Sequence, residues 1–111
     1  MASYAVEEID FLKKLHKCGK SKRPHLASEC QEKQVFAVCE CSDNYLRGKI
    51  PATTRQKQRL KKHVNILKNL ADPSINWKKK RTYIATQEGG AVISTLLGIA
   101  LPALLSYLTS R

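Results

Sequence analysis

Residues 91–108 read AVISTLLGIALPALLSYL and contain no charged side chain. At about 1.5 Å per residue, a helix of this length is close to the shortest that crosses the roughly 30 Å hydrocarbon layer of a membrane. Gly98 and Pro102 would loosen or kink it. The position near the C-terminus is typical of a tail anchor, and folding back onto the other helices is the alternative. The residues expected to face a membrane are Ile93, Leu96, Leu97, Ile99, Leu101, Leu104 and Leu105.

The positive charge is concentrated directly upstream of this apolar run. Residues 47–81 hold twelve lysines and arginines against one acid, Asp72, which accounts for the formal net charge of +11. In residues 1–46 the acids and bases balance. Such a segment favours binding to a polyanion, and a membrane protein with a basic collar is the second hypothesis.

The spacing of apolar residues predicts a mainly α protein. We expect a small helical bundle of three to four short helices, with a basic face and a C-terminal apolar helix. Ser3 is placed to cap a first helix that ends at Gly19, and Pro24 and Gly48 are placed to begin and end a second. The expected parts of the chain are a helical hairpin (1–48), a basic helix (49–72), a basic arm (73–88) and a hydrophobic helix (91–108).

The third predicted helix carries most of the candidate contacts with nucleic acid. Thr53 and Gln56 have the spacing of a capping box, and Asp72-Pro73 would end the helix. Beyond it, Ser74 is expected to cap a short fourth helix or extended arm, and Trp77 to contact the core. The candidate nucleic-acid-binding residues are Arg55, Lys57, Arg59, Lys61, Lys62, Lys68, Lys78, Lys79, Lys80 and Arg81.

The four cysteines, Cys18, Cys30, Cys39 and Cys41, are expected to be reduced thiols. The N-terminus has no pattern typical of a secretory signal, and a cytosolic start makes disulfides improbable. Only the Cys39–Cys41 pair approaches the spacing of zinc ligands, so we expect neither a metal site nor a cofactor. Helical periodicity turns Cys39 toward the core and Cys41 about 200° away from it, toward solvent.

The sequence contains none of the short motifs that mark common enzyme sites. It has no glycine-rich phosphate loop, no H-E-x-x-H and no Gly-x-Ser-x-Gly. Its acids lie in two amphipathic helices, where solvated faces explain them. We therefore do not expect an enzyme.

The join between the basic and apolar segments has a recognisable order. Residues 78–108 read KKKRTYIATQEGGAVISTLLGIALPALLSYL. This arrangement resembles core protein X of adenoviruses and its counterparts in adenovirus-like elements, the adintoviruses and Maverick or Polinton transposons. In the adenovirus-like elements the upstream region is also similar, with a CEC-containing helix (here 39–41) and a TxxQKxxLKK-type basic helix (here 53–62).

The resemblance implies a basic, DNA-associated core or minor structural protein of the virion, found in the virion and the host nucleus. Its partners would be double-stranded DNA and capsid proteins, with self-association as a further expectation. It also implies a candidate cleavage site at Gly89 and Gly90. Two alternatives stay open: a tail-anchored protein on the cytosolic face of a membrane, and a membrane-active peptide released at the glycine pair.

Overall fold

The computed structural model describes residues 3–19 and 21–109, and all regular secondary structure in these ranges is helical. This confirms the mainly α fold class and the long apolar helix at the C-terminal end. The helices are α1 (Tyr4–Glu7), α2 (Ile9–Lys17), α3 (Arg23–Ser28), α4 (Glu32–Leu46), α5 (Thr54–Lys61), α6 (Val64–Ala71), α7 (Trp77–Ala85) and α8 (Gln87–Thr109).

Several helix ends lie where the sequence placed them. The Ser3 hydroxyl accepts the Val6 N–H at 3.1 Å and so caps α1. Thr53 and Gln56 form the predicted capping box at the start of α5. After α4, Gly48 has a φ of +72°, and the next N–H closes back onto the Asn44 carbonyl at 2.9 Å. This left-handed C-terminal turn requires glycine.

The three helices predicted for the N-terminal two thirds are each divided in two. The first breaks at Glu8, between α1 and α2. The second breaks at residues 29–31, where Gln31 and Gln34 form a second capping box for α4. The third bends at residues 62–63, and α7 is capped by Asn76 instead of Ser74. Each bend lets both halves of the predicted helix turn their apolar residues toward the core. In a straight helix of the predicted length, the apolar residues at one end would extend beyond the core.

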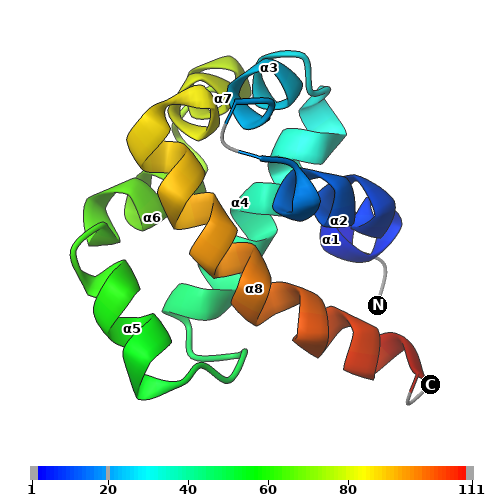
Figure 1. Cartoon of the computed structure of the whole chain (residues 1–111), viewed down its shortest axis with the longest axis vertical. Coiled ribbons are helices and arrows are strands. Elements are labelled where there is room, and N and C mark those ends of the chain that lie inside the picture. The colour runs from blue at the N-terminus through cyan, green and yellow to red at the C-terminus, as the bar shows by residue number, and fades with distance from the viewer. Residues whose placement is uncertain (1–2, 20, 110–111) are drawn as a thin grey trace.

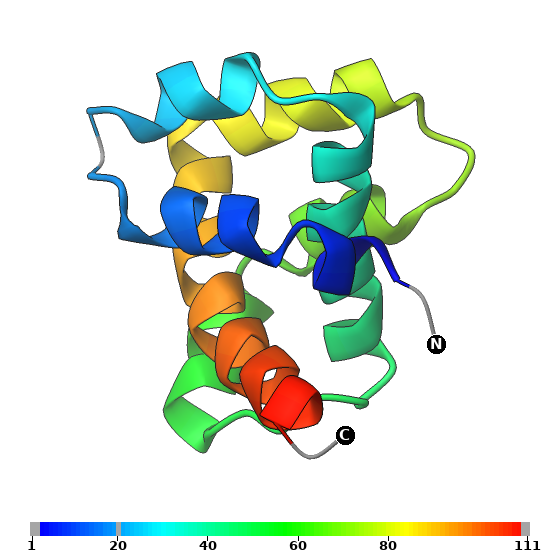
Figure 2. The same cartoon turned by 90° about the vertical axis from the view of Figure 1, so that its right-hand side faces the viewer.

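Helices α4 and α8 form the centre of the molecule, and the other helices pack around them. Figures 1 and 2 show α8 running obliquely past α4, with α2 on one side and α5 and α6 on the other. Helix α4 also contacts α1 and α7, and α3 lies along α7. A buried hydrogen bond of 2.8 Å, from the Ser42 hydroxyl to the Leu67 carbonyl, joins α4 to α6.

The apolar C-terminal run is part of this core. Helix α8 begins at Gln87, so the glycine pair lies inside the helix, whereas the sequence analysis placed it between the basic arm and the hydrophobic helix. Val92, Ile93, Leu96 and Leu97 are each at most 1% exposed. The alternative considered from the sequence, in which the run folds back onto the other helices, is therefore the arrangement seen here. The rest of the core comes from side chains of all seven other helices, α1 to α7.

Candidate nucleic-acid interface

The basic helix α5 and its C-cap residue present all five of their candidate cations to solvent. The capping box fixes where the helix starts, and Leu60, only 1% exposed, anchors its inner face. With Leu60 turned inward, the side chains elsewhere on the helix point outward. The exposed cations of α5 and its C-cap are Arg55, Lys57, Arg59, Lys61 and Lys62.

These five cations occupy two different faces of α5. Arg55, Arg59 and Lys62 are four and three residues apart, and so they share one face. Lys57 and Lys61, one turn apart, share another face about 140° around the helix. Helix α5 therefore offers two separable sets of positive charge.

Helices α6 and α7 extend the basic side of the molecule. In Figure 1, α5, α6 and α7 follow one another along one side of the molecule from bottom to top. Lys68 on α6 and Lys78 and Lys79 on α7 are exposed. With the five cations of α5 and its C-cap, eight of the ten candidate residues are therefore exposed. They belong to three consecutive helices and the C-cap of α5.

The other two candidates, Lys80 and Arg81, are turned inward. Lys80 is only 5% exposed and lies near enough to Cys39 and Asp72 to influence the pKa of each. Arg81 donates to the Cys30 carbonyl at 3.3 Å, and its guanidinium carbon lies 5.0 Å from the centre of the Trp77 ring. A cation over an aromatic face is stabilised there. These two side chains join α7 to the core, so they are less accessible to a phosphate than their neighbours.

Trp77 helps to attach α7 to the core and lies next to the exposed Lys78. It is half-buried and packs against the core, as the sequence reading expected. The Lys78 ammonium lies 5.9 Å from its ring centre. One face of α7 is therefore built from an aromatic ring flanked by cations.

The acids nearest these cations are held by local contacts. Asp72 accepts the Ser74 N–H at 2.9 Å and the Ser74 hydroxyl at 2.7 Å, and these bonds lower the pKa of its carboxyl. Glu88 lies 3.1 Å from Nδ1 of His63. Neither carboxylate makes a described ion pair with an exposed lysine or arginine of the basic helices.

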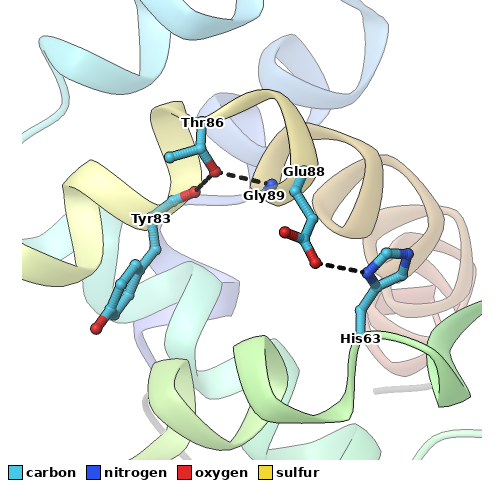
Figure 3. A network of polar contacts seen from close by, with 5 residues as sticks. All are labelled: His63, Tyr83, Thr86, Glu88 and Gly89. Carbon is cyan, nitrogen blue, oxygen red and sulfur yellow. Dashed lines mark hydrogen bonds and ion pairs between the residues drawn. The ribbon is translucent and has the colours of Figure 1, made fainter.

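The candidate cleavage site lies at the junction of α7 and α8. Figure 3 shows the Thr86 hydroxyl donating to the Tyr83 carbonyl at 2.7 Å and accepting the Gly89 N–H at 2.9 Å. Both Gly89 and Gly90 are buried within the helix. A Cβ on Gly89 would overlap the Tyr83 carbonyl, whose carbon would be 2.8 Å away. Gly89 therefore has a packing role, and a protease would have to unwind α8 to reach the glycine pair.

The sequence reading missed a buried arginine beside this junction. Arg23, which lies between the first two predicted helices, is 8% exposed. It donates to the Gly90 carbonyl at 3.3 Å and to the Cys18 carbonyl at 3.1 Å. No signal in the sequence distinguishes Arg23 from the lysines around it, because its burial depends on where α8 lies.

Most of the residues expected to face a membrane are in the core. Ile93, Leu96, Leu97, Ile99 and Leu101 are buried, Leu104 is half-buried and Leu105 is exposed. The segment Glu88–Thr109 is long and apolar enough to cross a membrane, a property that core helices of soluble proteins share.

The buried thiols are arranged differently from the prediction at one position. Cys39 is buried as expected, but Cys41 is also buried, at 2% exposed, because α1 and α8 cover the side of α4 expected to face solvent. Burial raises the pKa of Cys39 to about 11 and that of Cys41 to about 12. All four cysteines are free. Within the described residues no three metal-ligating side chains gather.

The chain was compared with models of protein families, with curated proteins and with solved structures, and none of the three comparisons gave a match.

Proposed function

We propose that the chain is a DNA-associated core or minor structural protein that neutralises packaged duplex DNA without reading its sequence. The observation that carries the proposal is the set of eight exposed cations on α5, α6 and α7, with no described acid paired to them. Lysine and arginine contacts to phosphate position a protein on DNA but do not specify a base sequence. The resemblance in the sequence suggests that the duplex is the genome of an adenovirus-like virus or element.

The size of the molecule fits this use. Its longest dimension is 34 Å, and duplex DNA carries one negative charge per 1.7 Å of its axis. A duplex laid along this dimension thus presents about twenty phosphates, more than the exposed cations can engage. Each phosphate that a lysine or arginine neutralises releases counterions from the duplex, and we expect this release to drive binding.

The test is the salt dependence of binding to a mixed-sequence duplex. If about six to eight phosphates are engaged, affinity should fall by about 10³ to 10⁴ between 50 and 200 mM salt. Replacing Arg55, Arg59 and Lys62 by glutamine should reduce the slope of log K against log salt by about 2 to 3, because about 0.9 is lost per phosphate contact.

A matched variant controls for net charge alone. Lys14, Lys17 and Lys22 are also exposed, but they lie on α2 or in the turn after it, outside the basic helices α5, α6 and α7. Their replacement by glutamine removes the same charge and should leave the slope nearly unchanged. An equal loss in both triple variants, or affinity that is flat with salt, would contradict the proposal.

The alternative function is attachment to a membrane through α8, and it rests on the length and apolar composition of Glu88–Thr109. Insertion would require Leu96 and Leu97 to leave the core. The exposed cations would then bind anionic lipid headgroups. The last prediction of the Discussion separates this alternative from the soluble arrangement.

A further inference from the structure

A groove of about 610 Å³ lies between the end of α4, the turn after it, and α5 and α6. Its floor contains Leu60 and Leu67, which are buried, and half-buried Ile50. Leu46 and Val64 stand at its edges, 37% and 36% exposed. They are two of the five large apolar side chains that are exposed in the described residues, and here both border one groove.

All the charge on this groove has one sign. Lys57 and Lys61 are the charged residues that line it. They belong to the second face of α5, away from Arg55 and Arg59. Their side chains leave the helix one turn apart, about 6 Å along the axis. An occupant that fits both features needs apolar side chains for the floor and two negative groups at that spacing.

We propose that this groove binds an acidic amphipathic helix of a partner protein. Glutamates at i and i+4 of a partner helix are also one turn apart, so they can meet Lys57 and Lys61 together while leucines between them enter the groove. A fatty acid or a single phosphate supplies only one anionic group for the two lysines. The inference goes beyond the proposed function, because it assigns a protein partner to Lys57 and Lys61, two of the eight exposed cations.

The test uses the full chain and two synthetic eighteen-residue helical peptides. One carries leucines at i, i+3, i+4 and i+7 with glutamates beside them, and the second replaces every glutamate by lysine. Fluorescence anisotropy at 150 mM salt should show binding of the glutamate peptide and none of the lysine peptide. Leu46→Glu or Val64→Glu should weaken this binding at least tenfold. Leu105→Glu, at a position 39% exposed but outside the groove, should change it less than twofold.

Charge reversals separate groove binding from general attraction. The double variant with Lys57→Glu and Lys61→Glu should no longer bind the glutamate peptide and should bind the lysine peptide instead. The pair Arg55→Glu and Arg59→Glu makes the same charge change on the other face and should keep the original preference. Both pairs should weaken DNA binding, so a failure of the groove proposal is distinguishable from a failure of the proposed function.

Four results would overturn the inference. Equal loss of peptide binding in the two reversal pairs would mean a non-specific charge effect, and failure of the glutamate peptide to bind the unmodified chain would exclude the partner class. Concentration-dependent self-association that Leu46→Glu abolishes would make a second copy the occupant. Flotation with anionic vesicles that Leu46→Glu abolishes would make lipid the occupant.

Discussion

At the scale of single residues, burial controls the chemistry of the thiols on α4. Cys39 and Cys41 are two positions apart and both buried, since α4 is covered on more than one side. Burial disfavours the thiolate, and for Cys41 the nearby Glu40 carboxylate adds to the effect. For Cys39 the nearby Lys80 opposes it. These thiols are therefore protonated and unreactive at neutral pH.

The raised pKa of Cys41 predicts a loss of stability at alkaline pH. Because its pKa rises from 9.0 to about 12 on folding, its contribution is fully present below pH 9 and is lost as the pH rises toward 12. Between pH 9.5 and 11, the free energy of unfolding of the wild type should therefore fall more steeply than that of Cys41→Ala, by about 1.4 kcal/mol per pH unit. Urea denaturation with a reductant present measures both slopes, and parallel slopes would exclude this role for Cys41.

At the scale of helices, three glycines of α8 have different surroundings. Alanine is favoured over glycine inside a helix by about 1 kcal/mol, which applies where space allows. A Cβ on Gly98 would meet only the His16 ring, at 3.7 Å, an ordinary contact. A Cβ on Gly90 would lie 3.4 Å from the Arg23 side chain. At Gly89 the obstacle is the Tyr83 backbone, which cannot move without shifting α7.

Substitution of these glycines by alanine should therefore have effects of opposite sign. Gly98→Ala should raise the free energy of unfolding by about 0.5 to 1 kcal/mol. Gly89→Ala should lower it by more than about 1 kcal/mol, because a backbone overlap forces α7 and α8 apart. Thermal unfolding monitored by circular dichroism provides the comparison. Similar gains in both variants would mean that Gly89 has no packing role.

The helix signals show what a sequence can predict at this scale. Local signals predicted helix ends at Ser3, Thr53 and Gly48, because the hydrogen bonds that fix these ends span at most five residues. The bends at Glu8 and His63 were not predicted, since the apolar periodicity continues across them and their cause is packing against distant helices. The same reason explains the burial of Lys80 in a run of four cations, where sequence position alone makes each look equivalent.

At the scale of the whole molecule, the place of α8 separates the two candidate functions, DNA association and membrane attachment. An uncharged run of eighteen residues has the same composition whether it fills a core or crosses a membrane, so the sequence left both open. The structure buries much of its first half between α2, α4, α5 and α7 and leaves Leu105 and Tyr107 exposed near its end. The basic helices lie around it, so a loss of α8 would also disperse the candidate DNA interface.

Two arginine substitutions at nearly the same depth of α8 separate the two arrangements. Leu97 is fully buried, whereas Thr95 is partly exposed, two residues away. With α8 packed in the core, Leu97→Arg places an unpaired charge there and should lower the free energy of unfolding by about 3 to 5 kcal/mol, a large part of a total of about 5 to 15 kcal/mol. Thr95→Arg should cost less than about 1 kcal/mol, because its long side chain reaches solvent.

In a membrane-spanning α8 the two positions differ by about 3 Å in depth, so both arginines should impair insertion alike, by about 2.5 to 3.5 kcal/mol. The measurements are thermal unfolding and flotation with anionic vesicles after nuclease treatment. We expect wild type and Thr95→Arg to unfold cooperatively and remain at the bottom of the gradient, and Leu97→Arg to lose its cooperative transition. Flotation of the wild type that both arginines abolish would show that α8 leaves the core, and would replace the DNA-associated proposal with a membrane-anchored one.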